Sequence, residues 1–231
     1  MDFKGPRLVI ESIFGNAHCL DCHGIRYVDF VWIGFLEMSE SKDGRLVIIS
    51  GPSGAGKSTV VRHLLNRCKL PLKLSVSATT RPPRAGEIDG VHYHFLDQSR
   101  FDQLREDGEF LECKEVFGLG YWYGTLRSQV ATGLAEGSWV ILEIDVQGAM
   151  SVLEQPEIDP ITFFIHTGGL DSLEARLRGR ETESEEVISR RLRIAADELE
   201  SMHRYQYQII NDSVDQAVDE ICQRLSEHRE H

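Results

Sequence analysis

The stretch Gly51-Pro52-Ser53-Gly54-Ala55-Gly56-Lys57-Ser58 decides the fold of this chain. It follows an apolar run at 46–50 that is typical of a buried strand, and it precedes a segment at 60–65 whose apolar residues recur at helical spacing. A strand, a Gly-rich turn and a helix in this order form a phosphate-binding loop. In such a loop the backbone N–H groups converge on an anion at the positive end of the helix.

The side chains of this loop have separate expected roles. The glycines permit positive φ values and keep Cβ atoms away from the phosphates. Lys57 is expected to reach the β- and γ-phosphates of a nucleoside triphosphate, and the Ser58 hydroxyl to ligate Mg²⁺. The predicted ATP-binding residues of the loop are Gly51, Pro52, Ser53, Gly54, Ala55, Gly56, Lys57, Ser58 and Thr59. The loop alone does not identify the phosphate acceptor, because GTPases, motor ATPases and many kinases share it.

The rest of the chain predicts an α/β fold of three layers with a mostly parallel central sheet. Further buried strands are expected at 139–144, 161–165 and 207–210, and an amphipathic helix follows residue 213. A polar, turn-rich segment and a segment crowded with charges of both signs break this pattern, and they predict an inserted lobe and an exposed helical lid. The expected division is a core of 45–74, 127–166 and 193–231, a lobe of 75–126 and a lid of 167–192.

Residues 1–44 stand apart from this pattern and are predicted to be an extension, either poorly ordered or not part of the working protein. Met38 precedes a polar stretch that would make an ordinary N-terminus, so we expect the working protein to start there. Within the extension, Cys19, Cys22 and His23 match a haem-attachment pattern. We interpret the match as a chance occurrence, with a zinc site that includes His18, or haem attachment, as alternatives.

Composition limits the function classes. The net charge of −12 argues against a general nucleic-acid binder, so anionic ligands must meet local clusters of Arg and Lys. The five cysteines do not suggest a disulfide framework, and no apolar run is long enough to span a bilayer. The first residues do not resemble a signal peptide. We therefore expect a cytoplasmic protein that acts on small molecules, with neither nucleic acid nor membrane as partner. The oligomeric state is not indicated.

Motifs beyond the loop resemble those of guanylate kinases, in the same order and over residues 45–231. They are Ser77-Ala78-Thr79-Thr80-Arg81-Pro82-Pro83-Arg84-Ala85-Gly86-Glu87, Phe110-Leu111-Glu112, Trp122-Tyr123-Gly124-Thr125, Leu142-Glu143-Ile144-Asp145-Val146-Gln147-Gly148, Arg176-Leu177-Arg178-Gly179-Arg180 and Asn211-Asp212. The resemblance implies reversible, Mg²⁺-dependent transfer of the γ-phosphoryl group of ATP to GMP, for purine nucleotide metabolism and GMP recycling. It also implies that the lobe is a small mixed GMP-binding lobe.

By resemblance, the phosphate of GMP is held by Arg81 and Arg84, with help from Tyr93 and Tyr123. Arginine suits this task because its planar fork meets phosphate oxygens in pairs and stays charged. The prolines between the two arginines keep the chain extended, so both side chains can face one ligand. Glu87 is expected to order this loop.

The base of GMP is read, by the same resemblance, by Glu112 with hydroxyls from Ser77 and Thr125. Guanine offers two adjacent donors, N1–H and the amine at C2, and one fixed carboxylate accepts both. Adenine would present an acceptor to that carboxylate and leave it unpaired, which is costly in a buried site.

Two acids and four polar side chains complete the expected site. Glu143 and Asp145 follow a strand at i and i+2, so they share one side of the sheet at the edge where open α/β folds bind ligands. The resemblance places both near Mg²⁺ and the GMP arginines, with Asp145 as a candidate metal ligand through water. It assigns lid roles in catalysis to Arg176, Arg180 and Arg191, beside Lys57 and Arg81, and it places Asn211 with ATP.

The sequence also departs from the pattern of the family. Glu181 adds a negative charge near the lid arginines, where glycine is usual.

Two other classes of protein compete with the assignment to a guanylate kinase. One is a non-catalytic guanylate-kinase-like binding module, which typically loses loop residues that this chain retains. The other is a kinase for a different nucleoside monophosphate, which Glu112 disfavours.

Overall fold

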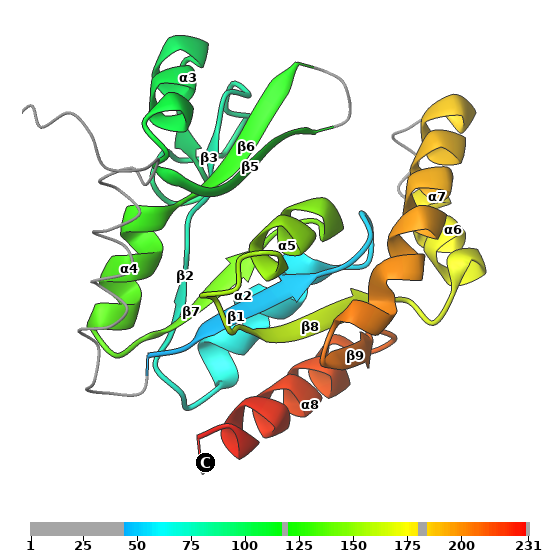
Figure 1. The fold of residues 1–231 in the computed structure, drawn as a ribbon. Coiled ribbons are helices and arrows are strands. Elements are labelled where there is room, and N and C mark those ends of the chain that lie inside the picture. Colours follow the sequence, from blue (N-terminus) through cyan, green and yellow to red (C-terminus); the bar gives the residue numbers. More distant parts are fainter. Residues whose placement is uncertain (1–43, 117–119, 180–183, 230–231) are drawn as a thin grey trace, which may run out of the picture.

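The computed structural model describes residues 44–116, 120–179 and 184–229, which form two sheets with flanking helices (Figure 1). The five-stranded central sheet has the order β2-β7-β1-β8-β9, and all of its strand pairs are parallel. Its strands are β1 (Leu46–Ser50), β2 (Leu72–Leu74), β7 (Trp139–Glu143), β8 (Ile161–His166) and β9 (Tyr207–Ile210). The expected strands are confirmed, and the short edge strand β2 is an addition to them.

Helices cover both faces of this sheet. Alternate residues of β1 face opposite sides, so Val47 packs in one apolar cluster and Ile48 in the other. Helices α2 (Lys57–Arg67) and α8 (Val214–Glu227) cover the first face, and α4 (Arg127–Ala135) and α5 (Val146–Leu153) cover the second. The three-layer α/β prediction is therefore confirmed.

A second sheet of four strands is built from the segment predicted to form the inserted lobe. Its order is β4-β3-β6-β5, with one parallel pair and two antiparallel pairs. The strands are β3 (Ala78–Thr79), β4 (His94–Phe95), β5 (Phe110–Val116) and β6 (Tyr121–Leu126). Helix α3 (Gln98–Glu106) closes the lobe, where Phe101 stacks on Phe110 with ring centroids 4.5 Å apart.

The charged segment forms two helices that stand at the opposite side of the central sheet from the lobe (Figure 1). They are α6 (Leu170–Arg178) and α7 (Glu185–Glu200), and the 3₁₀ turn η1 (Ser201–Arg204) leads from them into β9. Leu173, Leu177, Ile188 and Ala195 form their own small core. The lid boundary expected at 192/193 falls inside α7, so one continuous helix joins the lid to the core.

Several sequence-based predictions lie outside the described residues. These are the extension with its Cys19, Cys22 and His23 pattern, the lid residue Arg180 and its neighbour Glu181. Within the described ranges no helix is both long and apolar enough to cross a membrane.

Candidate active site

The phosphate loop joins the carboxyl end of β1 to the first turn of α2. Gly51 and Gly56 have φ values of 139° and 90°, which L side chains rarely adopt. Neither site has room for a Cβ atom. It would lie 2.0 Å from the Ile165 carbonyl oxygen at Gly51 and 2.5 Å from Asn211 Nδ2 at Gly56. The loop conformation therefore depends on glycine at both positions.

Lys57 is folded back onto its own loop. Its ammonium donates to the carbonyl oxygens of Gly51 (2.7 Å) and Pro52 (3.1 Å). Burial lowers the pKa of Lys57, while the negative charges of Glu143 and Glu198 act in the opposite direction. The lysine is thus held where a triphosphate would meet it, with acidic groups that favour its charged form.

Of the two acids after β7, Glu143 contacts the phosphate loop. The Ser58 hydroxyl donates to Glu143 Oε1 over 2.5 Å. Both oxygens of Asp145 have other partners. Oδ1 accepts the Gly148 N–H at 2.9 Å and caps α5, and Oδ2 pairs with Lys114. The water-mediated metal role of Asp145 stays a prediction.

The oxygen atoms of Ser58 and Glu143 therefore lie beside the phosphate loop, and oxygen is the ligand type that Mg²⁺ prefers. No group of three or more His, Cys, Asp and Glu side chains that could hold a metal occurs within the described ranges. Magnesium in kinase sites is held by one or two protein groups, substrate phosphates and water. The Ser58–Glu143 pair fits that kind of site.

Arg81 is the most constrained cation of the site. Its guanidinium meets the Glu87 carboxylate through Nη1 (2.9 Å) and Nη2 (2.8 Å), and its Nε donates to the Tyr123 hydroxyl (3.1 Å). The pair holds the pKa of Arg81 above its usual range and lowers that of Glu87 to about 2. Glu87 also accepts the Arg84 N–H at 2.7 Å, so the acid contacts both arginines of this loop, and its ordering role stays a prediction.

Three further groups surround this ion pair. Tyr93 and Tyr123 meet edge to face with ring centroids 5.7 Å apart, and the Arg81 guanidinium lies 5.4 Å from the Tyr93 ring centroid. Arg84 is exposed, and its side chain makes no hydrogen bond to other described residues. Arg81 is thus fixed by an ion pair, whereas Arg84 is exposed and lines the same cleft.

Glu112 lies across the cleft on β5, at the carboxylate position expected for base recognition. The Thr125 hydroxyl on β6 donates to Glu112 Oε1 at 2.7 Å. Burial raises the pKa of Glu112 to about 7, while the Thr125 hydrogen bond acts in the opposite direction. The carboxylate is therefore largely desolvated before any ligand arrives, so its charge would interact strongly with hydrogen-bond donors.

A single cleft of about 750 Å³ joins the loop to these groups. The predicted residues that line it are Ser53, Gly54, Gly56, Lys57, Ser58, Thr59, Ser77, Arg81, Arg84, Glu87, Tyr93, Glu112, Tyr123, Glu143, Asp145 and Arg191. Thr125 lies behind Glu112. Most of the predicted donor and acceptor residues of the described ranges therefore surround one cleft, whereas Gly51, Pro52, Ala55, Arg176 and Asn211 do not line it.

The predicted lid arginines of the described ranges both contact the loop region. Arg191 Nη2 donates to Ser53 Oγ at 2.8 Å, and Arg176 Nη2 donates to the Asn211 carbonyl oxygen. Asn211 is buried and donates through Nδ2 to the Ala55 carbonyl oxygen at 2.7 Å, while its Oδ1 has no hydrogen-bond partner. An orphaned acceptor beside the loop is suited to a nucleotide amine.

Eight residues of the cleft lining were not predicted as site residues, namely Lys114, Glu115, Gly124, Ile144, Gln147, Arg190, Ile194 and Glu198. Among the charged residues of this set, Glu198 and Lys114 have the most informative contacts. Glu198 lies on α7, two helical turns beyond Arg191, so the spacing of seven residues could have placed both on one helix face. Its Oε2 atom is buried without a hydrogen-bond partner, and burial raises its pKa to about 7 against the opposing charge of Lys57. No pattern in the sequence singled out Lys114, because its partners lie on α5.

Comparison with known proteins adds a second line of observation. A family model described as guanylate kinase matches residues 43–228. The guanylate kinase of Rhodopirellula baltica is 61% identical over 186 residues, which are 80% of this chain and 89% of that protein. The guanylate kinase of Caldanaerobacter subterraneus is 46% identical over 185 residues, with 80% and 87% covered. The crystal structure of guanylate kinase from Anaplasma phagocytophilum is similar with a TM-score of 0.65 and 31% identity, and the match covers 81% of this chain and 87% of that one.

Proposed function

The chain belongs to the guanylate kinase family, and we propose that it transfers the γ-phosphoryl group of ATP to GMP reversibly, with Mg²⁺, in the cytoplasm. The products would be ADP and GDP, for purine nucleotide metabolism and GMP recycling. The observation that supports this most directly is the single cleft, which has a phosphate loop on one side and a buried carboxylate with paired arginines on the other. The substrates named here, ATP and GMP, are small molecules, and neither nucleic acid nor membrane is a proposed partner.

On the donor side, the phosphate loop would hold the triphosphate through its backbone N–H groups and Lys57. Bound Mg²⁺ would neutralise phosphate charge, with Ser58 and Glu143 as the groups beside it. The buried Asn211 Oδ1 would accept from the adenine amine. These contacts would leave the γ-phosphoryl group facing the shared cleft.

On the acceptor side, Glu112 would accept the N1–H and C2 amine of guanine, with the Thr125 hydrogen bond fixing the carboxylate. Ser77 lines the same cleft and would add a hydroxyl at the base edge. Arg81 and Arg84 would hold the phosphate. Arg84 is the more available of the two, because Glu87 occupies much of the Arg81 guanidinium.

The reaction requires no general base, because the attacking phosphate oxygen is already ionised near neutral pH. Catalysis then depends on bringing two anions into line and neutralising the charge on the moving phosphoryl group. Lys57 supplies one cation, and Arg176 and Arg191 approach from the lid. We propose the same lid role for Arg180. Closure of a lid over both substrates would also exclude water.

A direct assay tests the proposal. The purified chain is given ATP and Mg²⁺ with GMP, AMP, CMP, UMP or dTMP in parallel, and ADP formation is measured. We expect GMP to be the preferred acceptor. Preference for another monophosphate would overturn the base assignment, and binding of GMP without any transfer would favour a non-catalytic module.

A further inference from the structure

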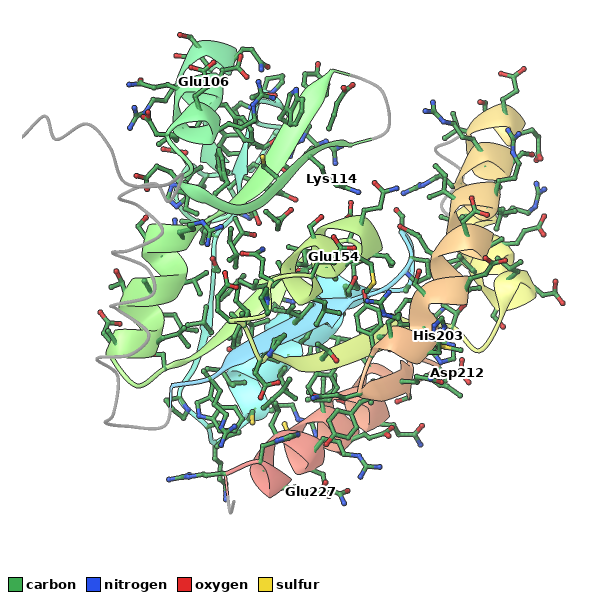
Figure 2. The ribbon with its side chains drawn as sticks, viewed as in Figure 1. Glu106, Lys114, Glu154, His203, Asp212 and Glu227 are labelled. Carbon is green, nitrogen blue, oxygen red and sulfur yellow. The ribbon has the colours of Figure 1, made fainter. Side chains whose placement is uncertain are left out.

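Strand β5 presents two charged side chains to the same neighbour. Glu112 and Lys114 are two residues apart, so they lie on one side of the strand, while Cys113 between them packs in the apolar core of the lobe. Figure 2 shows Lys114 on the part of β5 that faces α5. The ammonium of Lys114 forms an ion pair with Asp145 Oδ2 and donates to Gln147 Oε1 at 3.1 Å.

This contact crosses from the lobe to the core. Lys114 belongs to the second sheet, whereas Asp145 caps α5 and Gln147 lies in its first turn, directly after strand β7 of the central sheet. The side chains of Lys114 and Asp145 are 22% and 28% exposed, so they are partly shielded from solvent. A partly buried ion pair is screened less than a surface pair, and its loss leaves the remaining charge poorly solvated.

The same first turn of α5 also receives Glu112. A Cβ atom added at Gly148 would lie only 2.9 Å from Glu112 Oε2, so the carboxylate lies directly against the helix backbone at that point. Lys114 therefore fixes β5 to the helix turn on which Glu112 rests. A small shift of the lobe along α5 would move the Glu112 oxygens away from the base edge.

We propose that Lys114 is a positioning residue for acceptor recognition: by tying β5 to the first turn of α5 it holds Glu112 in the geometry that guanine requires. This inference rests on the proposed function, in which Glu112 reads the base. Lys114 also provides the cation nearest to Glu112 on its own strand, and its charge opposes the rise in the Glu112 pKa that burial and Asp145 cause. The contacts of Lys114 with α5 and its positive charge thus both favour an ionised Glu112 carboxylate in the position that guanine requires.

The positioning role of Lys114 predicts that its loss affects the binding of GMP and not that of ATP. In Lys114→Met, the KM for GMP should rise by about fivefold to tenfold, because a partly buried ion pair contributes about 1 kcal/mol and 1.4 kcal/mol is tenfold. The KM for ATP should change less than twofold. Lys114→Arg keeps the charge and the reach to Asp145, so it should restore the KM for GMP to within about threefold of the wild-type value.

A matched control uses Lys73, whose ammonium pairs with Glu136 at 2.8 Å on the more exposed side of the core. Lys73→Met removes a similar ion pair away from the cleft and should leave both KM values unchanged. Gln147→Leu is a second probe. Gln147 also lines the cleft, and the variant removes its hydrogen bond to Lys114 but leaves the Lys114–Asp145 ion pair, so it should raise the KM for GMP to a smaller extent. Thermal melting of each variant checks that the chain is folded, and Gln147→Leu provides the test if Lys114→Met does not fold.

The outcomes separate the two proposals. If the wild-type chain does not phosphorylate GMP, the proposed function fails. If the wild type is active but Lys114→Met and Gln147→Leu keep its KM for GMP, only the positioning role is wrong. Equal rises in both KM values, or no rescue by Lys114→Arg, would also overturn it.

Discussion

The two halves of the cleft are built in different ways. The donor half is one continuous loop, in which backbone groups and glycine conformations form the cradle, and Lys57 is held by carbonyl oxygens five and six residues away in sequence. The acceptor half is assembled from side chains of separate strands, such as Glu112 on β5 and Thr125 on β6. The geometry of the donor half therefore depends on a few neighbouring residues, whereas that of the acceptor half depends on how the strands of the second sheet pair.

Their electrostatics differ as well. Burial lowers the pKa of Lys57 in the donor half and raises the pKa of Glu112 in the acceptor half, so each half holds a partly desolvated charge of opposite sign. Under the proposed function, the Lys57 charge should serve phosphoryl transfer itself, because it would lie beside the phosphates. The Glu112 charge should serve the choice of acceptor, because it would face the base. Variants of the two halves should therefore change different kinetic constants.

The largest expected effect is in the donor half. Lys57→Ala should lower kcat by about 10²-fold to 10³-fold, the usual loss when one preorganised donor to transition-state charge is removed. The KM for GMP should change little, because the acceptor groups are untouched. Steady-state kinetics with GMP varied at saturating ATP measure both constants. Lys69→Ala, an exposed lysine just beyond α2, is the control. A kcat within tenfold of the wild-type value would contradict the distinction between the halves.

Next in size is the loss of base recognition. Glu112→Ala should raise the KM for GMP by about 10²-fold and weaken the preference for guanine, because two donors of the base lose their shared acceptor. Competition between GMP and AMP for phosphoryl transfer measures the preference. Glu109→Gln, which lies just before β5, removes a nearby charge without touching the base site and should behave as wild type. Unchanged GMP kinetics in Glu112→Ala would count against its role.

The charge of Glu112 also predicts a pH dependence. With a pKa of about 7, the carboxylate is mostly ionised at pH 8 and mostly protonated at pH 6. Since guanine needs the ionised form, the KM for GMP should rise by about tenfold as pH falls from 8 to 6. The groups that face Glu112 are Thr125, Asp145 and Lys114. The phosphate of GMP titrates near this range too, so Glu112→Gln supplies the reference, and an identical pH profile in that variant would exclude Glu112 as the source.

The smallest effect concerns Glu198, the acid of α7 that faces Lys57 in the donor half. Its pKa of about 7 means that it is ionised at pH 8, where it should repel the triphosphate. Glu198→Gln should therefore bind ATP about threefold to tenfold more tightly at pH 8 and equally at pH 6. Calorimetric titration with ATP measures the affinity at both values. The exposed neighbour Asp197 gives the control variant Asp197→Asn. Equal ATP affinities of wild type and Glu198→Gln at pH 8 would show that Glu198 does not oppose the nucleotide.

Much of the fold could be predicted because its elements leave periodic patterns. The runs that became β1, β7, β8 and β9 are short and apolar, and the final helix repeats its apolar residues every three or four positions. The strand β2 was not predicted, because three residues that pair only with β7 carry little pattern of their own. The predicted lid boundary at 192/193 falls within α7, because the charge pattern of the sequence changes there while the helix continues.

The candidate site divides in the same way. Local motifs indicated the loop, the arginines and Glu112 as candidates, and the structure places them around one cleft. The partners of these residues were not visible in the sequence: Glu143 with Ser58, Lys114 with Asp145, and Glu198 beside Lys57 are 85, 31 and 141 positions apart. Spacing within one helix or strand is fixed by backbone geometry, whereas such pairs depend on how elements pack.

By itself, the sequence determined the phosphate loop and the order of the layers, because glycine conformation and apolar periodicity act within a few neighbouring residues. Tertiary structure decided which acid touches Ser58, how far Arg81 is already occupied by Glu87, and where the lobe is tied to the core. The contact of Ser58 in α2 with Glu143 of β7, and that of Lys114 in β5 with Asp145 before α5, follow from the packing of separate elements. Burial there sets both the neighbours of each charge and its strength.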